Sequence, residues 1–192
     1  LHNSDLPQRE FDADQAAYHY KQSGPPGHIP LSAADAAFAG AVDAAQLMAN
    51  SAKKAGIDIE VVREPNDGYW SNVWNNDAKG WCACYWGGRP AETMMFSAAY
   101  VAESKWNDTM WKTTDSAVKF NQLVKDARKE LDESKKRDIL FECQRLIYDD
   151  GGLLCPLFNS YVSANSKKIA HGKIAANWDS DGAKCVERWW FA

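Results

Sequence analysis

One stretch constrains the fold of this chain more than any other, because Ile29 to Val62 reads as a strand, a helix and a strand in turn. Ile29 to Ser32 has the composition of a short strand. Five apolar residues then recur at helical spacing on one face, namely Phe38, Val42, Ala45, Ala49 and Ala52. Gly56 ends this helix, and Ile57 to Val62 alternates as a half-buried strand does. The order predicts an α/β domain in which helices flank a parallel or mixed sheet.

Further elements are predicted on both sides of this unit. Asp12 opens a short first helix, and Ser32 with Asp35 forms a capping box for the alanine-rich helix. Apolar patterns predict helices over residues 69–74, 91–100, 116–131 and 134–150, and strands over 81–86, 153–158 and 161–165. Leu131 and Cys155 are expected to be buried, whereas the polar segment 105–115 is expected to be a surface loop.

Charge and composition exclude several classes of protein. The chain of 192 residues is long enough for one domain with its own core, and 45% of its residues are hydrophobic. Its net charge of −4 argues against a nucleic-acid partner, which usually requires a basic surface. The apolar stretch 33–55 carries two aspartates and two lysines, which argues against a transmembrane helix there. The first residues lack the pattern of a leader peptide, although processing removes such a segment from secreted proteins.

The five cysteines match neither a redox motif nor a zinc site. Cys82 and Cys84 lie two residues apart on a predicted strand, which places their side chains roughly 6–7 Å apart and disfavours a disulfide between them. The four histidines are scattered, so no metal or other cofactor is predicted. No phosphate loop, nucleophile elbow or dinucleotide fingerprint is present. A hydrolase would have to use Cys82 or Cys84 as nucleophile with His171 or Asp179 assisting, and nothing in the sequence places either beside a thiol.

Nine tryptophans are the most unusual feature of the composition. Six of them lie between residues 70 and 111, and three lie between residues 178 and 190. Tryptophan combines a large apolar surface with one N–H donor, so such clusters suit either a hydrophobic core or an aromatic-lined pocket. Both interpretations stay open for each tryptophan. An aromatic-rich carbohydrate-binding module is a further alternative, which the predicted helices disfavour.

Several segments, taken in order, resemble one family of proteins. They are the "AKKAGI" helix end, the "DIEVV" strand, the "YWSNVW" helix, the "GWCACY" strand and the block from Asp115 to Phe158 that ends "RLIYDDGGLLCPLF". In this order they resemble the C-terminal lobe of extracytoplasmic solute-binding proteins of the peptide/nickel family, the receptors of ABC importers. The resemblance covers nearly the whole chain. It implies the C-terminal lobe of a two-lobed periplasmic-binding-protein fold of type II.

The resemblance also implies a ligand site. In oligopeptide-binding members the equivalent strand reads Gly-Trp-Cys-Ala-Asp-Tyr, and its aspartate resembles a counter-ion for the α-ammonium of the peptide. Trp81 fits this pattern, but Cys84 stands at the aspartate position, and a neutral thiol does not pair with a cation. Arg89 follows and suits a carboxylate or phosphate, so we expect a peptide-like or other small anionic solute. Trp70 resembles a ligand-packing aromatic, and Trp86 forms a stacking wall if its strand face points into the cleft rather than into the helices.

The same resemblance implies the partners of the chain. Residues 1–172 would form the ligand-binding lobe, and residues 173–192 would cross back to an N-terminal lobe outside this chain. The ligand would be trapped between the lobes in the periplasm and delivered to a membrane permease, with no catalysis implied. Relatives use a cysteine at the position of Cys82 in a disulfide, for which Cys143, Cys155 and Cys185 are the candidate partners here. Without the other lobe, the tryptophan-rich tail would leave an apolar patch and favour self-association.

Overall fold

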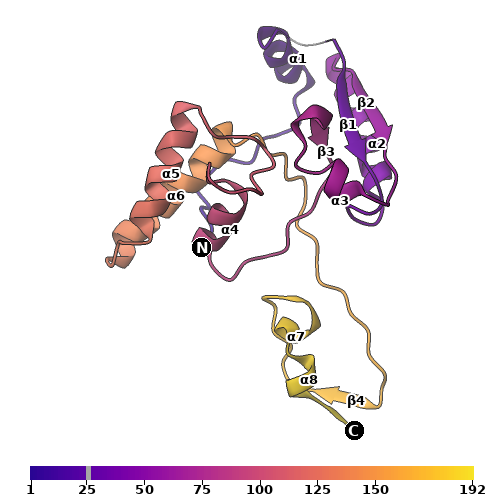
Figure 1. The fold of residues 1–192 in the computed structure, drawn as a ribbon, viewed down its shortest axis with the longest axis vertical. Coiled ribbons are helices and arrows are strands. Elements are labelled where there is room, and N and C mark those ends of the chain that lie inside the picture. Colours follow the sequence, from indigo (N-terminus) through magenta and orange to yellow (C-terminus); the bar gives the residue numbers. More distant parts are fainter. Residues whose placement is uncertain (25–26) are drawn as a thin grey trace.

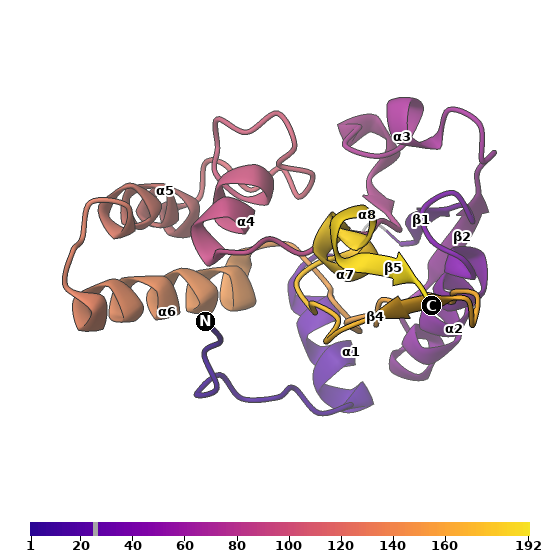
Figure 2. The same cartoon turned by 90° about the horizontal axis from the view of Figure 1, so that it is seen from below.

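The computed structural model describes residues 1–24 and 27–192. The chain divides into a sheet half (residues 13–82), a helical half (residues 92–150) and a tail (residues 169–192), as Figure 1 shows. An extended segment joins the helical half to the tail. Figure 1 shows the tail below both halves, at the end of this extended segment, and Figure 2 looks at the molecule from the side of the tail. The predicted α/β class is confirmed.

The sheet half is built on three parallel strands in the order β2-β1-β3. Its elements are α1 (Ala13–Gln22), β1 (Ile29–Ala33), α2 (Ala41–Ala52), β2 (Ile59–Arg63), α3 (Tyr69–Asn72) and β3 (Trp81–Cys82), with 3₁₀ turns at Lys53–Ala55 and Asp77–Lys79. Leu31 in the central strand stands opposite Val61 on one side and Trp81 on the other. The buried face of α2 consists of alanines, which allow the helix to lie close to the sheet. The predicted strand–helix–strand unit is therefore confirmed.

Ser32 and Asp35 do not cap α2, contrary to the prediction. The helix begins at Ala41 with Gly40 as its N-cap at a φ of 81°, and residues 34–40 form turns. Ser32 is buried in β1, where its hydroxyl donates to Glu64 Oε1 at 3.1 Å. The Ser32 hydroxyl therefore does not cap the helix. It donates instead to Glu64, the residue that follows β2.

The helical half consists of α4 (Glu92–Ala99), α5 (Asp115–Ala127) and α6 (Glu133–Asp150). Its core is a single cluster of buried residues: Phe96, Ala99, Tyr100, Trp111, Ala117, Phe120, Val124, Ala127, Leu140, Cys143 and Leu146. Phe120 lies at the centre, with ring centroids 5.5, 6.3 and 5.1 Å from those of Phe96, Tyr100 and Trp111. Leu131 is 92% exposed, contrary to expectation, because α5 ends at Ala127 and the apolar face ends with it.

The loop between α4 and α5 is not the surface loop that its polar composition predicted. Asn107 and Trp111 are buried within it. Asn107 Nδ2 lies 3.1, 3.3 and 3.0 Å from the carbonyl oxygens of Tyr100, Val101 and Trp111. Buried carbonyl groups need donors, and one side-chain amide here serves carbonyls on both sides of the loop. The hydrogen bonds of this buried side chain therefore hold the loop in one conformation.

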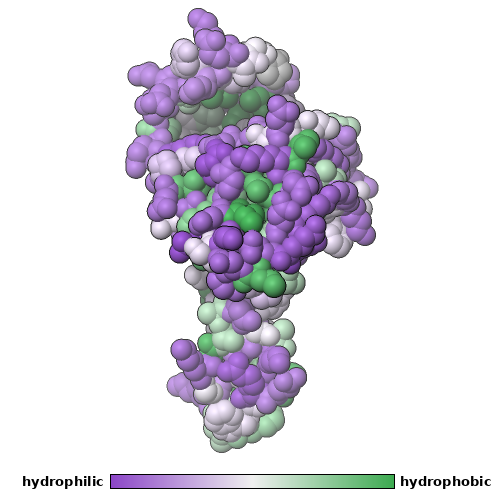
Figure 3. Space-filling model, turned by 90° about the vertical axis from the view of Figure 1, so that its left-hand side faces the viewer, coloured by the Kyte–Doolittle hydropathy of each residue, from purple (hydrophilic) through white to green (hydrophobic). Residues whose placement is uncertain are grey.

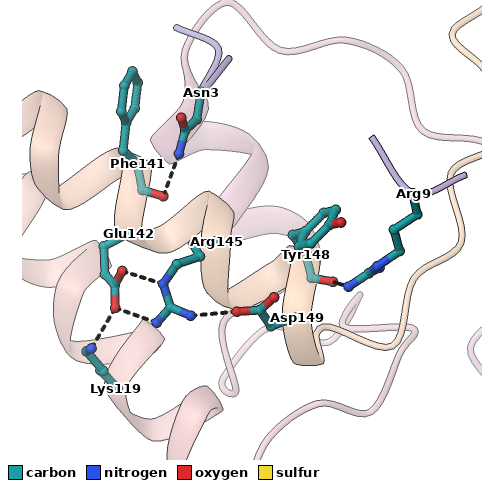
Figure 4. A network of polar contacts seen from close by, with 8 residues as sticks. All are labelled: Asn3, Arg9, Lys119, Phe141, Glu142, Arg145, Tyr148 and Asp149. Atoms are coloured by element: carbon teal, nitrogen blue, oxygen red, sulfur yellow. Dashed lines mark hydrogen bonds and ion pairs between the residues drawn. The ribbon is translucent and has the colours of Figure 1, made fainter. Parts of the chain in front are cut away.

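The first residues of the chain run along α6 (Figure 4). Asn3 Nδ2 donates to the carbonyl of Phe141 at 3.5 Å, and Arg9 Nη2 donates to the carbonyl of Tyr148 at 3.0 Å. The guanidinium of Arg9 also lies 3.7 Å from the ring centroid of Tyr148, a cation–π contact. The N-terminal segment before α1, in the sheet half, is thus attached to the last helix of the helical half.

Charged side chains link α5 and α6 on the same surface (Figure 4). Glu142 of α6 accepts from Lys119 of α5 at 2.6 Å and from Arg145 at 2.8 Å. The hydrogen bond from Arg145 lowers the pKa of the Glu142 carboxyl to about 2, and Lys119 acts in the same direction. Because Lys119 and Arg145 are exposed at the surface, the pairing adds little stability.

The segment 153–165 does not form the two predicted strands. It is extended, and among the described residues its backbone takes part in no backbone–backbone hydrogen bond. Its large apolar side chains point into solvent: Leu153, Leu154, Leu157, Phe158, Tyr161 and Val162. Cys155 is exposed as well, contrary to expectation. A strand requires a neighbouring strand for its ladder, and no strand of the described residues pairs with this segment.

The tail has its own small polar centre. It contains β4 (Ile169–His171), α7 (Asp179–Ala183), α8 (Cys185–Arg188) and β5 (Trp189–Phe191), with β4 and β5 antiparallel. Asp181 is buried and accepts hydrogen bonds from the backbone N–H of Ala175 at 2.6 Å and from Trp189 Nε1 at 3.0 Å, and it forms an ion pair with Arg188 at 3.1 Å. Figure 3 shows this tail joined by a narrow neck to a body whose face is mostly hydrophilic.

Replacing Phe120 by alanine tests the core of the helical half. Its side chain is 0% exposed, and truncation of a buried phenylalanine costs about 3–5 kcal/mol. We expect a loss of that size in the free energy of unfolding, measured by urea titration with circular dichroism. Leu131→Ala, at a site 92% exposed, is the control and is expected to stay within about 0.5 kcal/mol of the wild type. A loss below about 1 kcal/mol for Phe120→Ala would contradict the described core.

Candidate functional site

Tyr69 fixes one edge of the site at the C-terminal ends of the parallel strands. Its side chain is 1% exposed, and its hydroxyl lies 3.2 Å from the carbonyl oxygen of Ser32 in β1 and 2.6 Å from that of Ala83 just after β3. Burial raises the pKa of the Tyr69 hydroxyl, so it remains a donor. α3 is thereby held across the strand ends, and Trp70, the next residue, is exposed. In open α/β sheets this edge is where ligands bind.

A row of four aromatic side chains starts at Trp70 and is called here the aromatic row: Trp70, Trp74, Tyr85 and Trp86. The ring centroid of Trp70 lies 5.8 Å from that of Trp74 and 5.5 Å from that of Tyr85, and Trp74 lies 6.1 Å from Trp86. All three contacts are edge-to-face, the arrangement that aromatic pairs favour. Trp86 also packs against the core of the helical half. The row therefore joins the two halves of the chain.

Asp108 lies where the donors of this row converge. Its Oδ2 accepts from Trp74 Nε1 at 2.8 Å, from Trp86 Nε1 at 3.2 Å and from the thiol of Cys84 at 3.6 Å. The carboxylate is half-buried and follows Asn107, whose buried amide fixes the loop. Within the described ranges, no lysine, arginine or histidine forms an ion pair with Asp108. Asp108, Cys84 and the aromatic row form what we call the Asp108 cluster.

The structure brings together three of the five predicted ligand residues, namely Trp70, Cys84 and Trp86, in the Asp108 cluster. The alternation of a strand over residues 81–86 predicts one shared face for Cys82, Cys84 and Trp86, and this prediction is wrong because β3 ends at Cys82. Cys82 packs against the alanine-rich core beside Tyr69, whereas Cys84 and Trp86 turn towards Asp108. Their contact with a ligand stays a prediction.

Trp81 and Arg89 lie outside the cluster itself. Trp81 is 43% exposed in β3 and, in the part of the chain that is described, makes no ring contact with the aromatic row. Arg89 Nη1 donates to the carbonyl of Gly87 at 2.7 Å. Its guanidinium carbon lies 5.8 Å from the ring centroid of Trp86 and 5.9 Å from that of Trp178 in the tail. Arg89 also lines a cavity of about 410 Å³ that Phe158 borders.

Two cysteines near the site are held as thiols. Burial, with the charge of Asp108 as the next cause, raises the pKa of Cys84 to about 12 and raises the pKa of Cys82 as well. The thiolate is the reactive form of cysteine, so neither side chain is an activated nucleophile. His171, which a hydrolase would need beside them, lies in the tail with its ring centroid 5.1 Å from that of Trp189.

All five cysteines are described, and all five are free. The disulfide that the resemblance implied for Cys82 is therefore not formed. Cys143 is buried between α5 and α6, and Cys155 lies exposed on the extended segment. Among residues 1–24 and 27–192, no group of acidic, histidine or cysteine side chains is arranged to hold a metal ion. Nor does any helix in these ranges have the length and apolarity needed to span a bilayer.

Comparison with known proteins shows the fold. Neither a protein-family model nor a curated protein sequence matches the chain. Solved structures do: DppA from Helicobacter pylori, an ABC transporter-associated periplasmic binding protein in complex with the peptide STSA, has a TM-score of 0.65 and 17% identity over 79% of this chain. NikZ from Campylobacter jejuni in complex with Ni(L-His) has a TM-score of 0.60 and 14% identity over 77% of this chain.

A third structure, NikA from Staphylococcus aureus in complex with Ni(L-His)₂, has a TM-score of 0.56 and 18% identity over 78% of this chain. The chain covers 30%, 32% and 33% of the three structures, so it spans about a third of their length. At identities this low, the structural similarity establishes the fold alone. The predicted periplasmic-binding-protein fold of type II is confirmed.

Sequence reasoning missed Asp108, the residue on which the cluster converges. It lies in the polar segment 105–115, whose composition gave no reason to bring it near "GWCACYW". The one available signal was Cys84, which stands where the strand of oligopeptide-binding members carries an aspartate. That replacement invites a search for a carboxylate elsewhere, and the structure places one 3.6 Å from the Cys84 sulfur.

Thiol labelling as a function of pH tests the description of the cysteines. With a pKa of about 12, Cys84 is almost wholly protonated at pH 8, so we expect Ellman's reagent to label exposed Cys155 rapidly and Cys84 very slowly. The rate at Cys84 is expected to rise about tenfold per pH unit as the thiolate fraction grows. Peptide mass spectrometry assigns the sites, and urea-unfolded protein, in which all five cysteines react, is the control. Labelling of Cys84 at pH 7 as fast as that of Cys155 would contradict the buried thiol.

Proposed function

We propose that this chain is the C-terminal lobe of the substrate-binding component of an ABC importer of the peptide/nickel family. The lobe captures a peptide-like or other small anionic solute in a cleft shared with a second lobe, and the closed receptor delivers the solute to a membrane permease. The observation that carries the proposal is the Asp108 cluster, an aromatic and polar surface at the carboxyl ends of parallel strands in a periplasmic-binding-protein fold.

The exposure of the aromatic side chains in the Asp108 cluster supports the idea that this chain supplies one of two walls of the ligand site. Trp70 and Tyr85 are exposed, and aromatic surface of this kind contributes to binding only when a ligand and an opposing wall exclude water from it. A second lobe would supply that wall by hinge closure. The relatives whose structures resemble this chain are bound to a peptide or to nickel–histidine complexes.

The extended segment 153–165 supports the same arrangement. Its unpaired backbone and exposed apolar side chains form a surface that a neighbouring strand would cover. In the proposal, residues 1–172 are the ligand-binding lobe, and residues 173–192 return towards the second lobe. In the absence of that lobe, the apolar residues of the tail and of the segment would favour self-association.

The proposal includes a periplasmic location and no catalysis. Receptors of this kind act outside the inner membrane and release their ligand unchanged. The raised pKa values of Cys82 and Cys84, caused mainly by burial, support binding over cysteine-dependent hydrolysis. The parallel sheet with its helices supports a solute-binding lobe over a carbohydrate-binding module.

Binding by the whole receptor and by this chain alone tests the proposal. Isothermal titration calorimetry with a mixed-sequence tripeptide library is the measurement. We expect the full-length receptor, including its other lobe, to bind, and the isolated chain to bind at least about 100-fold more weakly, because half of the contact surface is missing. Circular dichroism confirms that the isolated chain is folded. Equal affinity of the two proteins would contradict a shared cleft.

Arg89→Ala tests whether Arg89 holds an anionic group of the ligand. Loss of a charged hydrogen-bonding partner is expected to lower the affinity of the full-length receptor for the tripeptide library about 10-fold or more. Arg63→Ala removes the same charge at an exposed site in β2 and is expected to leave the affinity unchanged. An Arg89→Ala receptor with wild-type affinity would assign Arg89 to packing between Trp86 and Trp178 instead.

A further inference from the structure

We infer that the cavity between α5 and the turn after α4 binds a small organic anion, namely a carboxylate with a short aliphatic chain. The cavity has a volume of about 370 Å³, which is within the range of pockets that hold small molecules. The described residues that line it are all outside the Asp108 cluster. The inference concerns a second site, and it does not depend on the proposed function.

One face of α5 forms the first wall of the cavity. Its lining residues recur at the spacing i, i+3, i+4 and i+7, which places side chains on one side of a helix: Asn121, Val124, Lys125 and Arg128. Val124 is 2% exposed and belongs to the core of the helical half. Lys125 and Arg128 are exposed. This wall therefore has an apolar base in the core and two cations towards the solvent.

Residues of α4 and of the turn after it form the opposite wall, which hydrogen bonds hold in place. Ser104 Oγ donates to the carbonyl of Ala98 at 2.5 Å. The backbone N–H of Ala102 donates to Asn121 Oδ1 at 2.8 Å and so ties the turn to α5. Val101 adds a half-buried apolar side chain to the lining. The two walls are thus held together without a ligand, which lowers the conformational cost of binding one.

The guanidinium of Arg128 reaches across the cavity. Cations are common near helix C-termini, where they complement the helix dipole, and Arg128 follows directly after α5. Its Nη2, however, donates to the hydroxyl of Ser97 in α4, on the opposite wall. That hydroxyl donates in turn to the carbonyl of Thr93. Among the described residues the guanidinium has this one hydrogen bond, so most of its N–H donors remain available to a carboxylate.

The charged side chains at the cavity favour an anion. Of the described residues that line it, Lys125 and Arg128 are cationic and Glu103 alone is anionic. Lys125 Nζ lies 3.6 Å from Glu103 Oε1, and both side chains are more than half exposed, so this ion pair adds little stability. A ligand carboxylate would displace Glu103 and pair with both cations. Its aliphatic chain would lie on Val101 and Val124.

Butyrate has both of the parts that the cavity accommodates. Inorganic phosphate would pair with the cations, but it would leave the apolar side chains of Val101 and Val124 in contact with water. Butylamine has the same aliphatic chain as butyrate, but its ammonium group would lie beside Lys125 and Arg128 and be repelled by them. Comparison of the three compounds therefore separates the contribution of the charge from that of the apolar chain.

An NMR titration of the ¹⁵N-labelled chain with butyrate, butylamine and phosphate tests the inference. We expect butyrate to bind with a Kd on the order of 1 mM, and about tenfold more tightly than either of the other compounds. The backbone amide signals of Ser97, Ser104 and Lys125 are expected to shift, whereas those of Cys84 and Asp108 are expected to stay in place.

Three variants test the roles of the charged side chains. Arg128→Gln is expected to weaken the binding of butyrate about tenfold, because it removes the main partner of the carboxylate. Arg137→Gln removes the same charge from an exposed site in α6 outside the cavity and is expected to leave the affinity unchanged. Glu103→Gln is expected to strengthen binding about threefold, because it removes the negative charge and releases Lys125. A gain of affinity does not arise from loss of folding.

Several outcomes would overturn the inference. They are the absence of shifts with butyrate, equal binding of butyrate and butylamine, shifts centred on the Asp108 cluster, and an Arg128→Gln affinity within about threefold of the wild type. Each of them would leave the proposed function in place, because the cavity and the Asp108 cluster share no described residue.

Discussion

The contact between Asp108 and the indoles of Trp74 and Trp86 is the interaction on which the arrangement of the two halves depends. Each half has its own core: the alanine-rich clusters beside the sheet on one side and the α4–α6 cluster on the other. Asp108 comes from the helical half, and Trp74 follows α3 in the sheet half. Hydrogen bonds to a charged acceptor are worth about 1.5–3 kcal/mol each. The residues of the Asp108 cluster thus also hold the sheet half and the helical half together, although each half has its own core.

The parts of the fold that were predicted correctly are those in which local pattern and burial agree. The alternation of Ile57 to Val62 and the apolar face of α6 each need only their own neighbours along the chain to be recognised. In α6, Leu140, Cys143 and Leu146 are buried as their spacing indicates. Gly56, at a φ of 69°, ends the alanine-rich helix region as a left-handed residue does.

Three of the incorrect predictions share one physical cause, which is that a distant or absent partner decided the outcome. Ser32 has a capping sequence, but Glu64 lies closer to its hydroxyl. Trp111 lies in a polar segment and is nevertheless buried, because its ring packs against Phe120 and its N–H donates to Asp150. The segment 153–165 has a strand composition and remains extended, because a ladder needs a second strand that this chain does not bring to it. For the candidate site, the sequence named Trp70 and Trp86 as candidates without deciding between core and pocket, and it did not indicate the carboxylate at their centre.

The unpaired segment 153–165 has a consequence for the order of events during synthesis. In the proposed receptor, a chain exported from its N-terminus onwards, the other lobe would reach the periplasm first and fold before this segment appears. The apolar side chains of Leu157, Phe158 and Val162, all largely exposed here, would then meet a finished surface as soon as they emerge. Export in this order would thereby protect the residues most prone to misassembly, and a permuted gene that placed this lobe first would lose that protection.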